Sequence, residues 1–197
     1  VYLVPLRGAY GLTVAYPPGC EVRPTFMVID PRRSFVRSVL AHEFTHALTF
    51  TYDLAHECAE YDWLSEAAGN WAMDFVYPAD NVEHYWSNRY FAYYDASLER
   101  DHDDGYGAYV FPFYVTLQYP DQVVPSIWSA TTSHDSLEAI NRSIEGGFEE
   151  RWPEFTLFNW NRPPVDVYRM MDGMEEQIVG ASTVEVALQG AGDKRQE

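Results

Sequence analysis

Hydrophobic and polar positions follow two different patterns along this chain. Short runs of β-branched and aromatic residues occur in residues 1 to 16 and 25 to 30, and they are interrupted by Pro17-Pro18-Gly19 and by Pro24. Short apolar runs bounded by proline and glycine are typical of strands joined by turns. The pattern predicts two or three strands in a small N-terminal antiparallel sheet.

The second pattern begins near residue 34 and is helical. Ser34 is a candidate N-cap, and apolar side chains then recur at helical spacing as far as Leu48. A second helix is predicted to begin near Asp62 and to end before Pro78. Because helices follow the short strands, the expected fold class is α+β, mainly α.

Capping signals predict later helices. Asp80 with Glu83 is typical of a capping box, here opening a helix to about Leu98, and Asp135 with Glu138 predicts another. A polar loop is expected at residues 100 to 105. Two further helical segments are expected at residues 106 to 115 and 148 to 158.

The length and composition favour one compact domain. The chain has 197 residues, of which 47% are hydrophobic and 16% aromatic, enough to bury a substantial core. The helical pattern weakens after Pro163-Pro164, and the tail is polar and rich in glycine. We therefore expect one domain over residues 1–162, with residues 163–197 forming an appendage or the start of a neighbouring domain.

The charge balance excludes two classes of partner. The chain has 30 acidic and 13 basic residues, a net charge of −17, and such a surface repels nucleic-acid phosphates and anionic membranes. No apolar run reaches the roughly 18 residues of a membrane span. We expect no nucleic-acid partner and no membrane span, and a secreted or otherwise extracellular location. Because Val1 is not a start residue, an excised domain or a processed chain is expected.

The chain has two cysteines, Cys20 and Cys58. Neither belongs to a CxxC pair, so a structural zinc knuckle is not indicated. A Cys20 to Cys58 bridge and two unpaired buried thiols are both compatible with the sequence.

The strongest chemical signal is His42-Glu43-Phe44-Thr45-His46, an HExxH motif on the first predicted helix. Residues i and i+4 lie on one helix face, so His42 and His46 can direct two imidazoles at one metal ion. Glu66 follows on the next helix and is a natural third ligand. A zinc ion held by three protein ligands keeps a fourth position for water and lowers the pKa of that water to about 7. Glu43 is then the candidate general base.

One residue could support this site from behind the ligands. Asn70 lies four positions after Glu66, on the same helix face, where its amide could orient a ligating imidazole. Two histidines at this spacing also occur as solvent-facing helix residues. The segment Trp63-Leu64-Ser65-Glu66 that follows favours a metal site over this alternative.

These motifs resemble those of the gluzincin zinc metallopeptidases, the group that includes thermolysin-like and aminopeptidase-N-like enzymes. Residues 63 to 68, Trp-Leu-Ser-Glu-Ala-Ala, are similar to the Trp-Leu-Asn-Glu-Gly-Phe of the aminopeptidase branch, and the likeness covers residues 34 to about 77. The resemblance implies a zincin-like catalytic domain, Zn²⁺ bound by His42, His46 and Glu66, and Glu43 as the base. Asn70 departs from the Asp of thermolysin-like members, which leaves that supporting position uncharged.

The resemblance also implies an oxyanion donor from a segment after the second zinc helix. Tyr106 is the first choice because it opens a Tyr-Gly-Ala run similar to the one that carries the catalytic tyrosine in aminopeptidase-like members. The register relative to the glycine differs, so Tyr109 and His102 are alternatives. Donors directed at developing negative charge contribute about 10²-fold or more in rate.

The sequence thus predicts a zinc-dependent peptidase that hydrolyses peptide bonds through a metal-activated water. A strand at residues 25 to 30 could pair with an extended peptide or protein substrate. The Gly-x-Met-Glu-Asn motif that anchors a free amine in aminopeptidases is absent, which weakly favours an endopeptidase. Two alternatives stay open: a catalytically silent gluzincin-like zinc-binding domain used for binding or adhesion, and a zinc hydrolase of another bond.

Overall fold

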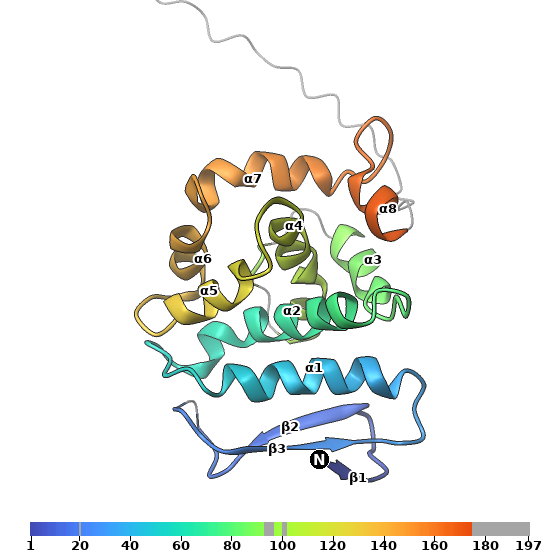
Figure 1. The fold of residues 1–197 in the computed structure, drawn as a ribbon, viewed down its shortest axis with the longest axis vertical. Helices are drawn as coiled ribbons and strands as arrows, with labels where there is room; N and C mark the ends of the chain where they lie inside the picture. Colours follow the sequence, from blue (N-terminus) through green and yellow to red (C-terminus); the bar gives the residue numbers. More distant parts are fainter. Residues whose placement is uncertain (20, 93–96, 100–101, 175–197) are drawn as a thin grey trace, which may run out of the picture.

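The computed structural model describes residues 1–19, 21–92, 97–99 and 102–174, with the backbone alone at residues 102–104. The sheet comprises β1 (Tyr2–Leu3), β2 (Gly11–Ala15) and β3 (Thr25–Ile29), and helices follow it along the chain (Figure 1). The α+β, mainly α class predicted from the sequence is confirmed.

The sheet is mixed rather than wholly antiparallel. Its strand order is β1-β3-β2, so β3 is central. β2 pairs antiparallel with β3, with Gly11 opposite Ile29, whereas β1 pairs parallel with β3, with Tyr2 opposite Val28. Alternating apolar residues indicate that a strand exists but carry no information on its direction, which explains the difference from the expected arrangement.

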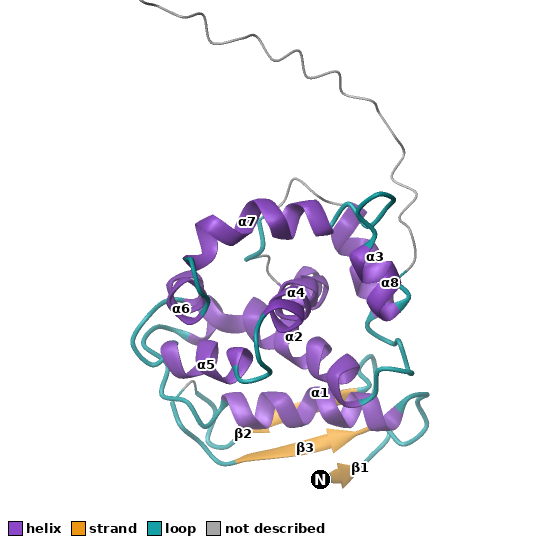
Figure 2. Ribbon diagram, turned by 45° about the horizontal axis from the view of Figure 1, so that its top comes forward, coloured by secondary structure: helices purple, strands orange, loops and turns teal. Residues whose placement is uncertain are grey.

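The helices are stacked on one face of this sheet. Helix α1 (Val36–Thr49) lies between the sheet and α2 (Cys58–Val76), and the other helices lie beyond α2 (Figures 1 and 2). These are α3 (His84–Ala92), the 3₁₀ helix η1 (His102–Tyr109), α4 (Val110–Gln118), α5 (Val123–Ala130), α6 (Ser136–Ser143), α7 (Gly147–Phe158) and α8 (Val167–Asp172). The layers bring α1 into contact with β2 on one side and with α2 on the other.

Two of the three predicted helix caps differ from the structure. The N-cap of α1 is Phe35, in the left-handed region at φ 58°, rather than Ser34. Asp80 caps no helix, because its carboxylate accepts hydrogen bonds from the Arg37 guanidinium, at 2.8 Å to Nε, and from the Ser38 hydroxyl, both on α1. The third cap is as predicted.

That third cap opens α6. The Asp135 carboxylate accepts a hydrogen bond of 2.8 Å from the main-chain N–H of Glu138. This bond satisfies one of the N–H groups that a helix N-terminus leaves unpaired.

The core lies among the helices and extends past the predicted domain boundary at residue 162. Its fully buried members include Tyr109, Tyr114 and Phe155, together with Tyr168 and Met174. Residues 163–174 therefore pack as part of the same structure, and residues 175–197 lie outside the described residues.

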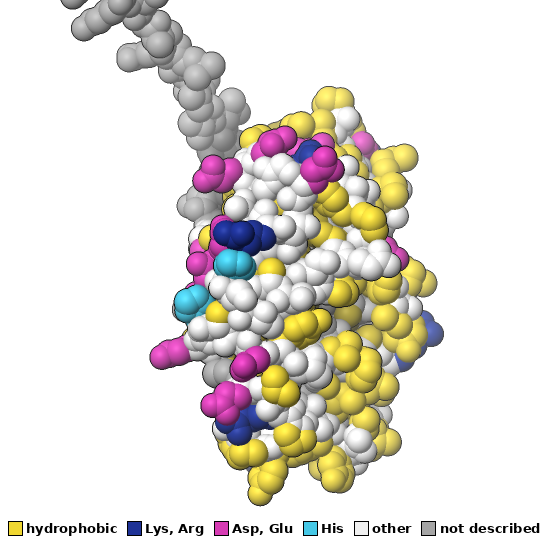
Figure 3. Space-filling view, turned by 60° about the vertical axis from the view of Figure 1, so that its left-hand side comes forward, with side chains coloured by type: hydrophobic (Ala, Val, Ile, Leu, Met, Phe, Trp, Pro, Cys, Tyr) yellow, Lys and Arg dark blue, Asp and Glu magenta, His cyan; other side chains and the backbone are white. Residues whose placement is uncertain are grey.

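Apolar side chains are exposed at the sheet end of the molecule. They include Tyr2, Leu3, Leu12 and Phe26, and hydrophobic side chains gather over the lower part of the face drawn in Figure 3. Among the described residues, no helix is both long enough and apolar enough to cross a membrane.

One of the two cysteines lies among the described residues. Cys58 is the first residue of α2, and no described cysteine is free. Cys20 lies outside the described residues, so the Cys20 to Cys58 bridge stays a prediction.

Candidate metal centre

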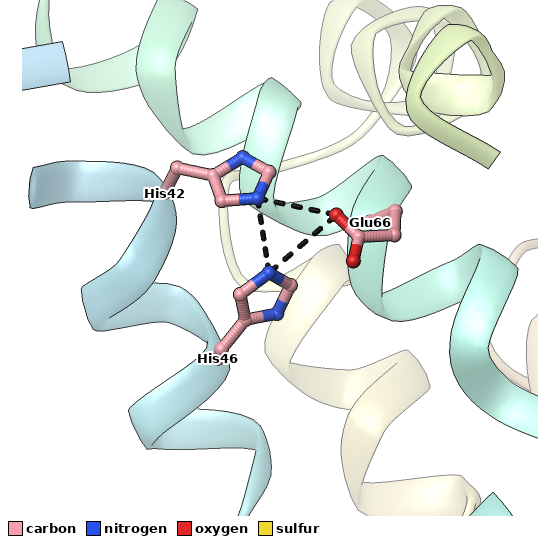
Figure 4. Close-up of side chains that lie close together, drawn as sticks. All are labelled: His42, His46 and Glu66. Carbon is pink, nitrogen blue, oxygen red and sulfur yellow. Dashed lines mark hydrogen bonds and ion pairs between the residues drawn. The ribbon is translucent and has the colours of Figure 1, made fainter. Parts of the chain in front are cut away.

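The two motif histidines and Glu66 meet where α1 packs on α2. His42 and His46 are one turn apart on α1, and their Nε2 atoms are 2.9 Å from each other. Glu66 reaches them from α2, with its Oε2 atom 3.2 Å from Nε2 of His42 and 3.5 Å from Nε2 of His46 (Figure 4). The structure thus brings together the three residues that the sequence predicts as ligands.

These separations fit a single metal ion. Zinc bonds of 2.0–2.2 Å in tetrahedral geometry place the donor atoms about 3.3 Å apart. The three separations, 2.9, 3.2 and 3.5 Å, lie around that value. The Oε2 atom of Glu66 is buried and has no hydrogen-bond partner among the described residues. A donor set of two imidazoles and one carboxylate suits zinc.

The electrostatics of the site favour a positive charge between the three side chains. Burial acts to raise the pKa of Glu66, but its interactions with the His42 and His46 imidazoles outweigh burial and lower that pKa. Burial acts to lower the pKa of His46, and the nearby Glu66 carboxylate outweighs it, so that pKa is raised. The carboxylate is therefore held ionised, the form in which it binds a cation.

Side chains on α2 hydrogen-bond to both histidines from behind, and one of them sets the tautomer of His42. The Oδ1 atom of Asn70 lies 3.1 Å from Nδ1 of His42, and the Asn70 amide N–H donates to the main-chain oxygen of Tyr106 at 2.9 Å. The Asn70 oxygen must therefore face His42, whose Nδ1–H donates to it. The Nε2 lone pair of His42 is therefore left for a metal. Ser65 Oγ lies 2.8 Å from Nδ1 of His46, and its hydroxyl can accept a hydrogen bond from that nitrogen when His46 Nε2 binds a metal.

Asn70 was expected beside a ligating histidine, but Ser65 was not. The signal that could have identified Ser65 is its position next to Glu66, in the place where the aminopeptidase branch carries Asn. The position before Glu66 faces His46 here, and the Ser65 hydroxyl contacts its Nδ1 atom.

Glu43 is held against the sheet. Its side chain is only 6% exposed, and the Thr13 hydroxyl of β2 lies 2.7 Å from its main-chain oxygen and 2.8 Å from its Oε2 atom. A Cβ atom placed on Gly11 of the same strand would lie 2.6 Å from both Cγ and Oε1 of Glu43. The close packing of α1 on β2 thus restrains the candidate base, and a glycine makes this packing possible.

A second glycine allows α2 to approach α1. A Cβ atom on Gly69 would lie 2.7 Å from both Cε1 and Nδ1 of His42. Gly69 stands one residue before Asn70, so the same turn of α2 both clears space for the imidazole and supplies its hydrogen-bond partner. Neither Gly11 nor Gly69 belongs to a recognisable sequence motif, and the sequence did not predict a role for either residue.

The three candidate oxyanion donors are placed differently. The Tyr106 ring stacks on His42, with ring centroids 5.7 Å apart, and on Trp86 at 4.7 Å. Tyr109 is fully buried, and its hydroxyl points toward the sulfur of Met174 at 3.9 Å, within the helical core. The side chain of His102 lies outside the described residues. Of the two described tyrosines, the structure brings Tyr106 to the site and leaves Tyr109 in the core.

Comparisons of this chain with protein-family models, with curated proteins and with solved structures found no match.

Proposed function

We propose that this protein is a zinc-dependent peptidase that hydrolyses peptide bonds, with endopeptidase action weakly favoured. The observation that carries the proposal is the convergence of His42 Nε2, His46 Nε2 and Glu66 Oε2 within 3.5 Å of one another. The resemblance of the same residues to the gluzincin motif supports it. The expected extracellular location belongs to the same proposal.

His42, His46 and Glu66 would hold the metal, and Glu43 would act as general base. Zinc, when bound, supplies the polarisation of a carbonyl and lowers the pKa of water. Glu43 takes a proton from the attacking water and returns it to the leaving amine. Thr13 orients the Glu43 carboxylate through its hydroxyl. The Tyr106 hydroxyl donates to the oxygen that becomes negatively charged.

The strand that pairs with a peptide substrate is assigned to β2 rather than to residues 25 to 30. The sequence favoured residues 25 to 30, but β3 is the central strand, paired with β2 along its length and with β1 at one end. Among the described strands, β2 forms an edge and also contacts Glu43 through Thr13. A peptide added to this edge would pass next to the candidate base.

The proposal is tested with Glu43→Gln. The variant keeps the size of the side chain and all three proposed ligands, but the amide cannot accept a proton from water. We expect loss of hydrolysis of a quenched peptide library by about 10³-fold or more, with about one zinc per site retained. Glu149→Gln, which changes an exposed carboxylate on α7, serves as the control and should be fully active.

If the wild type and Glu43→Gln hydrolyse the library equally poorly while zinc stays bound, the peptidase proposal fails. The alternative of a catalytically silent zinc-binding domain would then hold.

A further inference from the structure

A second group of acidic and histidine side chains lies outside the candidate metal centre. Glu83 and His84 stand at the start of α3, and Asp172 ends α8. One donor atom from each of the three lies within 4.8 Å of the others. Their side chains are 0%, 16% and 7% exposed, respectively, so the group is almost closed to solvent.

His84 is central to the group. Its Nε2 atom is 2.7 Å from Oδ2 of Asp172 and 3.6 Å from Oε1 of Glu83. A third carboxyl group lies nearby on α2, because Asp74 is only 7% exposed and its charge interacts with those of Asp172 and Glu83. The four side chains thus come from α2, from α3 and the residue before it, and from α8, and His84 and Asp172 are separated by 88 positions in the sequence.

Glu83 is the unusual member. Both of its carboxylate oxygens are buried, and neither has a hydrogen-bond partner among the described residues. A buried carboxylate is normally satisfied by hydrogen bonds, by an ion pair or by a metal ion. The 3.6 Å approach of Oε1 to His84 directs Glu83 into the group. The burial of these two oxygens therefore indicates a binding partner for Glu83 that is not one of the described side chains.

The group also carries an excess of acidic side chains. Three carboxyl groups face one imidazole, and those of Asp74, Glu83 and Asp172 are all at most 7% exposed. A buried cluster of this composition is balanced by retained protons or by a bound cation. A cation would satisfy the oxygens of Glu83 as well, which a proton shared between Asp74 and Asp172 does not.

We propose that Glu83, His84 and Asp172 bind a second divalent cation of the transition-metal class, with the Asp74 carboxyl group beside them. The imidazole decides the class, because Ca²⁺ and Mg²⁺ prefer oxygen ligands alone whereas zinc and manganese accept mixed nitrogen and oxygen donors. The separations of 2.7 and 3.6 Å lie on either side of the ~3.3 Å expected around a tetrahedral ion.

Cation binding at this site would tie the start of α3 to the end of α8. The proton held between His84 and Asp172 would be released to solvent, since a ligating imidazole must offer a lone pair. The ligands are closed in by the helices, as in structural rather than catalytic sites. The proposal does not depend on peptidase activity, because none of these residues belongs to the site around His42.

The first test is metal content after loading with zinc and removal of excess. We expect about two ions per chain in the wild type and about one each in Glu83→Gln and in His46→Ala. The double variant should bind none. Retention of both ions by Glu83→Gln would overturn the second site, whereas retention of both by His46→Ala would overturn the site on α1 and α2. The two failures are thus distinguishable.

The second test uses thermal stability in the His46→Ala background, where only the second site remains. With chelator present, Glu83→Gln should raise Tm, because it removes a buried negative charge that has no hydrogen-bond partner among the described residues and lies near two other carboxyl groups. At a zinc or manganese concentration of about 100 times Kd, the parent should gain about 5–10 °C and Glu83→Gln should gain nothing. Glu149→Gln, on the surface of α7, is the matched control and should follow the parent in both conditions.

A parent protein that zinc and manganese leave unchanged in Tm would overturn the proposal. Stabilisation by Ca²⁺ alone would overturn the assigned class of cation. Equal stabilisation of the parent and of Glu83→Gln by zinc would show that the ion binds elsewhere, and would overturn the proposal too.

Discussion

Nδ1 of His42 lies 3.1 Å from Oδ1 of Asn70, and the same amide is anchored on its other side by the main-chain oxygen of Tyr106. The amide cannot flip without losing both hydrogen bonds, so the tautomer of His42 follows from the backbone position of η1. In this way a segment 36 residues further along the chain controls the orientation of a proposed metal ligand.

Removing the Asn70 side chain should weaken metal binding. In Asn70→Ala, His42 loses the acceptor for its Nδ1–H, and we expect zinc affinity to fall by about 10- to 100-fold in a competition assay with a chromogenic chelator. Asn70→Asp is the matched control, since it keeps an oxygen facing His42 and should retain most of the affinity. An affinity loss that is equal in the two variants would show that the Tyr106 contact, rather than the histidine tautomer, is what matters.

The two glycines that border the site should separate metal binding from base function. Gly69→Ala places a methyl group against the His42 ring, so zinc affinity should fall. Gly11→Ala places one against the Glu43 carboxylate, so peptide hydrolysis should fall by about 10-fold or more while the zinc content stays unchanged. Metal analysis and peptidase rates, measured on the same preparations, check both expectations.

If Gly11→Ala lost zinc to the same extent as Gly69→Ala, the separate placement of the metal ligand and the base would be contradicted. Gly8→Ala is a useful reference for the loss of a glycine in the same N-terminal region, since no atom lies within 4 Å of a Cβ built there. Its φ of +85° makes it a test of backbone strain alone.

Substitution can separate two roles of Tyr106, namely donation of a hydrogen bond by its hydroxyl and positioning of His42 by its ring. Tyr106→Phe keeps the ring stacked between His42 and Trp86 but removes the hydroxyl. If the hydroxyl stabilises the oxyanion, kcat should fall by about 10²-fold with unchanged zinc affinity. Tyr106→Leu removes the stack as well and should also weaken zinc binding. Full activity of Tyr106→Phe would leave the ring a positioning role only.

Helix periodicity accounts for the part of the site that the sequence predicted. His42 and His46 share a face because they are four residues apart, and so do Glu66 and Asn70. The α+β class followed in the same way, because the change from short strands to helical spacing is visible locally. These features need no information about which elements pack together.

The features that the sequence did not predict depend on packing between distant segments. Thr13 reaches Glu43 across 30 positions, and His84 reaches Asp172 across 88. The spacing of Asp80 and Glu83 predicted that the Asp80 side chain would cap a helix, and this prediction was wrong because tertiary contacts compete with local capping. Arg37 and Ser38 on α1 bind the Asp80 carboxylate instead.

That contact makes stability depend on pH in a defined direction. Hydrogen bonds from Arg37 and Ser38 lower the pKa of Asp80 to about 2, below the value near 3.9 of an unfolded chain. The folded state therefore binds a proton on Asp80 less readily than the unfolded state does. The stabilisation is fully present above about pH 4 and is lost as the pH falls toward 2.

Asp80→Asn should accordingly lower Tm at pH 7, and its difference from the wild type should shrink as the pH falls from about 4 to about 2. Both proteins are compared in chelator, because protonation of the proposed histidine ligands would release metal at low pH. Asp121→Asn, which changes an exposed carboxylate, should match the wild type throughout. A Tm difference between Asp80→Asn and the wild type that stays constant from pH 7 to pH 2 would rule out the ionised Asp80 carboxylate as its source, and the tie between α1 and the segment after α2 would then rest on the hydrogen bonds of a neutral group.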